Sequence, residues 1–152
     1  MTSDTSIDVR EVIFINPDAE SGYDGLQAGV GEVADGAVTL LQNGGVPTRK
    51  GLWRVLKGKL RGIGEIRIND GTNTFRVYVW LGCEPALYIL DAGMKKSPTG
   101  SEIPGWQLDR LVDRLVDRRE RAARDCLDNA DLEQAFADRA MRREQRGQGA
   151  ER

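Results

Sequence analysis

The sequence of 152 residues contains no histidine and only two cysteines. Without histidine, a nucleophile–histidine pair and a histidine metal site are both excluded, so any proton transfer must use Lys, Tyr, Asp or Glu. Cys83 and Cys126 lie far apart in the sequence and match no metal-ligand or redox spacing. We therefore expect no metal, no cofactor and two reduced cysteines, which suit a reducing cytoplasm.

Long apolar runs are also absent. No stretch approaches the roughly 18–20 apolar residues that a membrane span needs. The first six residues are polar and acidic, unlike a secretory signal. Hydrophobic residues make up 39% and charged residues 30% of the chain, a composition typical of soluble globular proteins. These features predict a cytoplasmic protein that has no membrane partner.

The charge is distributed unevenly along the chain. Residues 1–42 carry a net charge of −7, residues 43–100 carry +6, and residues 101–152 carry −1. A basic middle segment favours a polyanionic partner for that segment. The alternative is that the acidic N-terminal third neutralises the basic middle within the molecule.

Hydrophobic periodicity predicts the main elements. Residues 9–15 read as a strand that stops at Asn16-Pro17, and residues 30–41 carry an apolar stripe at helical spacing, ended by residues 43–45. Three strands follow over residues 65–69, 74–80 and 86–90, while residues 48–64 could be helix or loop. The pattern predicts an α+β fold, with an N-terminal strand and helix packed on a small antiparallel sheet.

The C-terminal third predicts a long helical extension. From Gly105 onward, Leu108, Leu111 and Leu115 recur at helical spacing between repeated Asp-Arg pairs. We expect a domain over residues 1–104, a helical extension over 105–141 with a second helical stretch from about Leu132, and a disordered tail over 142–152. The apolar seam of the 106–127 helix could pack on its own domain, which is the default, on a second copy in a homo-oligomer, or on a partner.

Alternation along the hairpin places two arginines together. Ile66 and Ile68 point to one face of their strand and Arg67 to the other, and Arg76 alternates in the same way with its apolar neighbours. A four-residue loop over 70–73 would set Arg67 and Arg76 directly opposite each other, about 4.5–5.5 Å apart at Cβ. Two guanidinium groups this close favour an anion between them. The structural alternative is a salt bridge from Glu65 to Arg67.

More positive charge and two aromatic residues converge on the hairpin. Tyr78 and Trp80 offer rings on which an RNA base could stack, although both could equally belong to the core. The candidate substrate-binding residues are Lys57, Lys59 and Arg61, which precede the hairpin. The candidate catalytic residues are Arg67, Arg76, Tyr78, Lys95 and Lys96, the last two following the third strand.

The same residues carry a resemblance to a toxin family. Lys57-x-x-Leu60-x-Gly62-x-Gly64-Glu65-Ile66-Arg67-Ile68, then Phe75-Arg76-Val77-Tyr78, then Lys95-Lys96-Ser97-Pro98 resemble the RelE/HigB-type toxins, most closely the phage-derived branch of the RelE/ParE superfamily. The likeness spans residues 9–104. It implies the toxin of a type II toxin–antitoxin system, an endoribonuclease that cleaves mRNA on the ribosome and binds a cognate antitoxin.

The resemblance also implies roles for the candidate residues. RNA cleavage by 2′-OH attack places negative charge on the phosphorane, which arginines and lysines stabilise by a few kcal/mol each. Arginine stays protonated, so a lysine whose pKa is lowered by nearby cations is the candidate base, and Tyr78 is the candidate acid.

One departure from the family pattern favours other functions. The chain reads Asp91-Ala92-Gly93-Met94-Lys95-Lys96 where the family often has His-x-Phe-x-Lys-Lys. Without that histidine, two alternatives stay open. The protein could be a non-catalytic assembly or partner-binding protein of phage type on the same scaffold, or a ParE-like gyrase poison.

Overall fold

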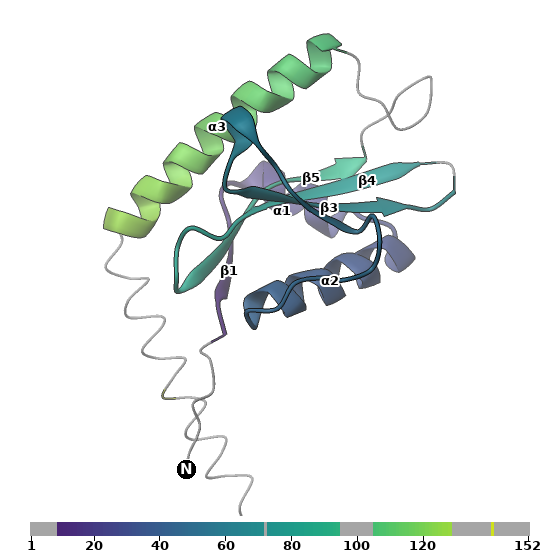
Figure 1. The fold of residues 1–152 in the computed structure, drawn as a ribbon, viewed down its shortest axis with the longest axis horizontal. Coiled ribbons are helices and arrows are strands. Elements are labelled where there is room, and N and C mark those ends of the chain that lie inside the picture. The colour runs from purple at the N-terminus through teal and green to yellow at the C-terminus, as the bar shows by residue number, and fades with distance from the viewer. Residues whose placement is uncertain (1–8, 72, 95–104, 129–140, 142–152) are drawn as a thin grey trace, which may run out of the picture.

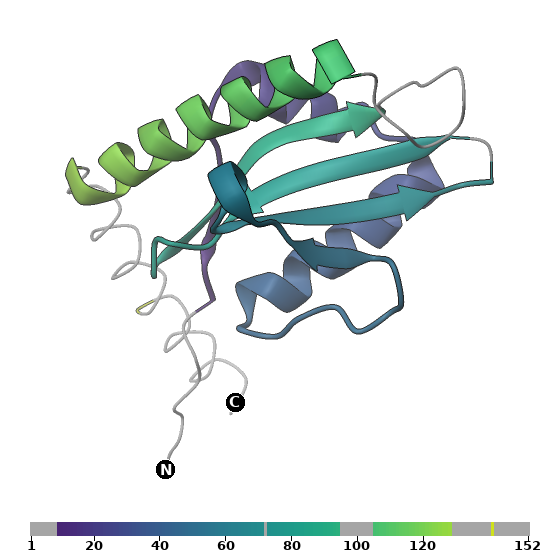
Figure 2. The ribbon, with the colours of Figure 1, turned by 45° about the horizontal axis from the view of Figure 1, so that its top comes forward.

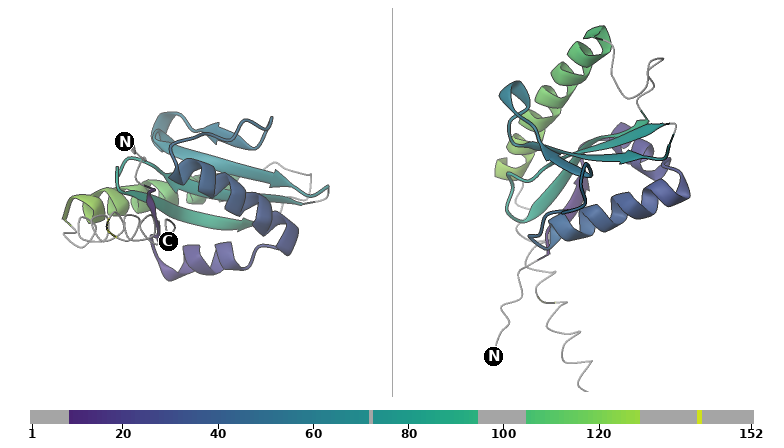
Figure 3. Two further views of the ribbon diagram at one scale, coloured as in Figure 1. Left: turned by 90° about the horizontal axis from the view of Figure 1, so that it is seen from below. Right: turned by 45° about the vertical axis from the view of Figure 1, so that its right-hand side comes forward.

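A five-stranded sheet lies between helices that cover its two faces (Figure 1). The structure is a computed structural model that describes residues 9–71, 73–94, 105–128 and 141. Helices α1 (Pro17–Asp24) and α2 (Ala28–Gln42) lie on one face, and α3 (Gly105–Asp128) lies on the other (Figure 3). This arrangement confirms the predicted α+β class and its long C-terminal helix. The helical stretch from about Leu132 and the tail over 142–152 lie outside the described residues.

The sheet is mixed, in the order β1-β5-β4-β3-β2. The strands are β1 (Glu11–Phe14), β2 (Trp53–Val55), β3 (Ile63–Asn69), β4 (Thr74–Trp80) and β5 (Ala86–Met94). Strands β2 to β5 pair antiparallel, whereas β1 pairs parallel with β5, with Glu11 opposite Ala86. The parallel pair is possible because α1 and α2 return the chain across one face before the hairpin begins.

Helix α1 was not predicted, because Asn16-Pro17 was interpreted as a turn. Asn16 is instead the N-cap: its side-chain oxygen accepts a hydrogen bond from the Ala19 N–H at 2.9 Å, and Pro17 is the first helical residue. Both residue types are typical of a helix start. Gly22 lets α1 lie close to β5, since a Cβ at this position would be 2.1 Å from the Ala92 carbonyl oxygen.

The face beneath α1 and α2, called the apolar face here, holds the larger core. The predicted stripe of α2 is buried as expected, and α2 ends at Gln42 with Asn43 as its C-cap. The core residues that α2 meets from the sheet are all hydrophobic: Ile66, Ile68, Phe75, Val77, Val79, Leu87, Ile89 and Ala92. The apolar side of each strand therefore faces α2, which fixes the opposite side of each strand toward α3.

The segment 48–64 is neither one helix nor one loop. It contains the edge strand β2 and a short 3-10 turn, η1 (Gly58–Leu60). Strand β2 sits close to β3, because the ring of Trp53 covers Gly64 at a position where a Cβ would lie 1.9 Å from the ring. Arg54 pairs with Glu65 across this edge.

The face beneath α3, called the polar face here, combines a smaller core with charged residues. Helix α3 buries Leu111, Leu115 and Ala122 against a cluster that includes Ile63, Tyr88 and other residues of β3, β4 and β5. Two residues of the predicted seam, Leu111 and Leu115, therefore pack on the chain's own domain, whereas the third, Leu108, is 44% exposed. Figure 2 shows α3 running along the β5 side of this face, with the hairpin tip of β3 and β4 extending beyond it.

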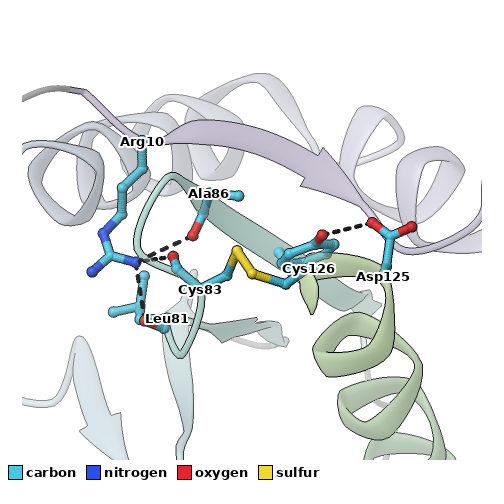
Figure 4. Close-up of a disulfide and its surroundings, with 7 residues drawn as sticks. Arg10, Leu81, Cys83, Ala86, Asp125 and Cys126 are labelled. Atoms are coloured by element: carbon cyan, nitrogen blue, oxygen red, sulfur yellow. Dashed lines mark hydrogen bonds between the residues drawn. A yellow bond between two sulfur atoms is a disulfide. The ribbon is translucent and has the colours of Figure 1, made fainter. Parts of the chain in front are cut away.

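The two cysteines are joined, which makes the expectation of reduced cysteines wrong. Cys83, in the turn between β4 and β5, forms a disulfide with Cys126 of α3 (Figure 4). Because the two cysteines are 43 residues apart, the sequence pattern does not predict this bond. It forms because the fold brings the end of α3 back over the turn. Among the described residues, no helix has the length and apolarity of a membrane span.

Candidate functional site

The register of the hairpin agrees with the prediction from side-chain alternation. Arg67 of β3 lies directly opposite Arg76 of β4, and both belong to the polar side of their strands. One step away, Glu65 lies opposite Tyr78, which in turn lies opposite Asp91 of β5. The polar face thus carries two neighbouring rows of functional side chains.

Glu65 is a buried carboxylate that binds two arginines. It is 3% exposed, its Oε2 lies 3.5 Å from the Nε of Arg76, and its Oε1 lies 3.2 Å from the NH2 of Arg54. The predicted salt-bridge alternative therefore holds for Glu65, but the partner in the hairpin is Arg76 rather than Arg67. Arg76 is itself 5% exposed, and two buried opposite charges are stable only when paired.

Arg67 has a different environment. Its Nε is buried and makes no hydrogen bond within the described part of the chain. Together with Arg49 and Lys50 it lines a small cavity of about 100 Å³, whose described lining contains no acidic residue. This cavity, called the basic pocket here, has the size and charge to hold a phosphate group.

A backbone hydrogen bond holds the segment that contains Arg49 and Lys50 beside Arg67. The Arg67 N–H donates a hydrogen bond to the Leu52 carbonyl at 2.8 Å, which extends the contact of β2 with β3 into the preceding loop. The sequence showed these two residues only as part of a basic segment. Their position beside Arg67 depends on the pairing of β2 with β3, which the segment's glycine-rich pattern did not predict.

Lys57, Lys59 and Arg61 are exposed at the other end of the β2–β3 edge. They flank η1, where the NH1 of Arg119 donates hydrogen bonds of 2.8 Å to the Lys59 and Arg61 carbonyls. From Arg61 to Arg67 the chain extends by roughly 20 Å at a strand's rise of about 3.3 Å per residue. These three residues and the basic pocket, with the exposed Arg54 between them, form a row of cations along β2 and β3, called the basic edge here.

The two aromatic residues belong to the core. Tyr78 is 2% exposed, and its burial raises the pKa of its hydroxyl well above the ordinary value, an effect to which the Glu65 carboxylate adds and which Arg76 opposes. Trp80 is half-buried and contacts Tyr88 at 5.8 Å between ring centroids. In this conformation Tyr78 offers no free ring face for a base, so core packing is the reading that holds.

Asp91 connects the polar face to α3. A bulge in β5 separates Asp91, which pairs with Tyr78, from Ile89, which pairs with Val79. The residue between them, Leu90, accepts a hydrogen bond of 2.8 Å from the NH1 of Arg118. Arg118 also lies 3.4 Å from the Asp91 carboxylate, and Arg114 lies 3.1 Å from it. Sequence reasoning did not single out these α3 arginines, because they are part of a repeated Asp-Arg pattern.

Other candidate sites are less specific. Lys95 and Lys96 lie outside the described residues. Beside the end of α3 lies an open hollow of about 490 Å³, whose described lining consists of two basic and two acidic residues, a mixture that favours neither sign of ligand. Within the described ranges, no group of three or more metal-ligating side chains is close enough to hold an ion.

The comparison with known families places this site in context. Residues 23–115 match the family described as Phage derived protein Gp49-like (DUF891). The chain belongs to the Gp49-like family. The match covers the hairpin, the basic edge and β5, whereas Arg118 and Cys126 of α3 lie beyond it. No curated protein matches the chain.

Proposed function

We propose that this Gp49-like protein is the toxin of a type II toxin–antitoxin system, which binds RNA along its basic edge and cleaves mRNA on the ribosome. The Gp49-like family is associated with toxin–antitoxin systems of the RelE/HigB type, and an antitoxin is accordingly the expected protein partner. The observation that carries the proposal is the basic pocket, where Arg49, Lys50 and Arg67 converge without a carboxylate among the described lining residues.

RNA binding follows from the charge and its spacing. The basic pocket lies at one end of β3, and Lys57, Lys59 and Arg61 lie at the other. Successive phosphates of a strand laid along this edge would meet cations at both ends and Arg54 in between. Such contacts release counterions, so the affinity should fall steeply as salt rises.

Cleavage would use the cations nearest the scissile phosphate. Arg67 is the candidate that stabilises the phosphorane, with Lys95 and Lys96 as candidate base and electrostatic partners. The ion pair with Glu65 fixes the orientation of Arg76 beside it. Tyr78 is the candidate proton donor because its hydroxyl is protonated at neutral pH, although its raised pKa makes it a weaker acid than an exposed tyrosine.

Binding can be tested with a labelled single-stranded RNA. We expect Arg67→Ala and the double variant Arg49→Ala/Lys50→Ala each to weaken binding about tenfold, which is roughly 1.4 kcal/mol, and to reduce its salt dependence. Arg124→Ala, an exposed charge on α3, is the matched control and should bind like the wild type. Equal affinity of all four proteins would contradict the proposed interface.

Activity is tested by induced expression in bacteria. The wild type should arrest growth and shorten ribosome-bound mRNA, and Arg67→Ala should relieve both effects at equal protein level. Arrest that persists in Arg67→Ala with intact mRNA would contradict the nuclease and favour a different target, such as the ParE-like action on gyrase.

A second function is favoured by the burial of the hairpin side chains. Arg76 and Tyr78 are 5% and 2% exposed, a state that suits a non-catalytic protein which binds a partner through the same scaffold. RNA binding with no cleavage and no growth arrest would select this function over the toxin.

A further inference from the structure

The disulfide joins α3 to the turn that leads into β5. Cys83 is 1% exposed in this turn, and Cys126, near the end of α3, is partly exposed. Of the two sulfurs, that of Cys126 therefore offers the easier approach to an attacking thiolate.

The turn that holds Cys83 is fixed independently of α3. The NH1 group of Arg10 donates hydrogen bonds to the carbonyls of Leu81 at 3.0 Å, Cys83 at 2.7 Å and Ala86 at 3.2 Å (Figure 4). These bonds come from the residue before β1 and would persist if the disulfide were broken. Breaking the disulfide would therefore remove the covalent tether of α3 while the turn keeps these hydrogen bonds.

The remaining hold on α3 is partly electrostatic. Arg118 is 8% exposed and depends on Asp91 and the Leu90 carbonyl for compensation. A buried charge pair adds little net stability, because desolvation offsets the attraction. Leu111, Leu115 and Ala122 form a narrow apolar seam on a helix whose other residues are mostly charged. Besides the covalent link and this seam, α3 is held by hydrogen bonds that Arg119 donates to the Lys59 and Arg61 carbonyls and that Tyr88 donates to Asp125.

The Cys83–Cys126 disulfide matters because α3 covers part of the polar face. Tyr78 shares its cluster with Leu111 and Leu115, and Asp91 of the neighbouring row is capped by Arg114 and Arg118. Departure of α3 would uncover Tyr78 and release Asp91, and so would change both the access to the polar face and its charge.

We propose that the Cys83–Cys126 disulfide is a redox latch, which holds α3 over the polar face and opens when a dithiol reductant breaks it. A thiolate of the reductant attacks the Cys126 sulfur, and Cys83 leaves as a thiolate that takes up a proton. The second thiol of the reductant then attacks the mixed disulfide and releases Cys126. The protein gains two electrons and two protons, and the dithiol becomes a cyclic disulfide. The role of the latch in RNA binding rests on the proposed function.

Hydrogen exchange on the full chain tests the latch itself. In the wild type, reduction with dithiothreitol should accelerate exchange of the α3 amides at least tenfold and leave those of β3 and β4 unchanged. The variant Cys126→Ser should exchange like the reduced wild type with or without dithiothreitol, and Cys83→Ala/Cys126→Ala provides the second test if serine disturbs packing. The proposal would be overturned if reduction left the exchange of the α3 amides unchanged. It would also be overturned if the protein purified without reductant contained two titratable thiols.

Binding of a labelled single-stranded RNA separates the latch from the proposed function. We expect the affinities of the reduced and oxidised wild type to differ at least fivefold, because departure of α3 changes the exposure of Tyr78 and Asp91, and we expect Cys126→Ser to bind like the reduced form. Equal affinity in both states would overturn the regulatory role. Absence of RNA binding in both states would overturn the proposed function, and the exchange experiment would then decide the latch alone.

Discussion

The two faces of the sheet are covered in different ways. On the apolar face, α2 and the strands pack together in one hydrophobic cluster. On the polar face, the residues buried near α3 include Glu65, Arg76, Asp91 and Arg118. Apolar burial stabilises a contact without requiring a specific partner, whereas a buried charge depends on the specific groups that neutralise it. The packing of α2 on the apolar face therefore needs no specific partner groups, whereas the packing of α3 on the polar face depends on specific charge pairs.

The disulfide stabilises the polar face, where it links α3 to the turn before β5. For a separation of 43 residues, the loop-entropy relation gives a stabilisation of roughly 4 kcal/mol relative to the unlinked unfolded chain. The buried ion pairs around Asp91 contribute far less in net terms. The covalent link thus compensates for the polar composition of the surface that α3 covers.

The largest effect is expected at Glu65. Replacement by Ala removes a buried carboxylate that pairs with the buried guanidinium of Arg76, so the free energy of unfolding should fall by about 3–5 kcal/mol in a denaturant titration. The matched control is Arg54→Ala, which removes the partner of Glu65 that is 64% exposed and should cost less than about 1 kcal/mol. Similar losses in the two variants would show that Glu65 is not a buried charge centre.

The apolar face is tested by Leu41→Ala. Leu41 is 2% exposed in α2, and its truncation should lower the free energy of unfolding by about 3 kcal/mol because a cavity remains. Its neighbour Leu40 is 48% exposed, and Leu40→Ala should change stability by roughly 0.5 kcal/mol or less. If the two substitutions cost the same, α2 does not pack as described.

Alkaline pH should weaken both faces through the tyrosines. Burial raises the pKa values of Tyr23, Tyr78 and Tyr88, and the hydrogen bonds that Tyr23 donates to Asp35 and Tyr88 donates to Asp125 raise two of them further. Their stabilisation is fully present below the unfolded pKa of about 10 and is lost as pH rises toward the higher folded values. Thermal unfolding above pH 10 should show a falling midpoint, less steep in Tyr78→Phe. A midpoint independent of pH there would contradict the raised pKa values.

The smallest effect is expected at Arg114. Its side chain is 40% exposed and pairs with Asp91 at 3.1 Å. Because solvent screens this pair, Arg114→Ala should lower the free energy of unfolding by less than about 1 kcal/mol, measured by denaturant titration. A loss as large as that of Glu65→Ala would mean that α3 is held mainly by charge, and the contrast between the two faces would be stronger than described.

Alternation along strands was enough to predict part of the site. The apolar sequences around Ile66 and Val77 required Arg67 and Arg76 to share a face, and the loop length set them opposite each other. In the same way, the apolar spacing from Val30 to Leu41 predicted which side of α2 is buried. Both predictions depend on neighbours in the sequence, where periodicity is a reliable signal.

Contacts between distant segments could not be predicted in this way. The choice of Arg76 rather than Arg67 as partner of Glu65 depends on side-chain directions across two strands. The approach of Arg49 and Lys50 to Arg67 depends on how β2 joins the sheet, and the Cys83–Cys126 bond depends on where α3 ends. No local pattern carries this information, because each contact is a product of the assembled fold.

The parallel pairing of β1 with β5 has a consequence for synthesis. Glu11 of β1 pairs with Ala86 of β5, so β1 leaves the ribosome well before its partner strand and cannot pair until β5 has been made. Contacts of such long range slow folding. A nascent chain that ends before residue 86 has no position for β1, and the sheet should therefore be completed only after β5 has been synthesised.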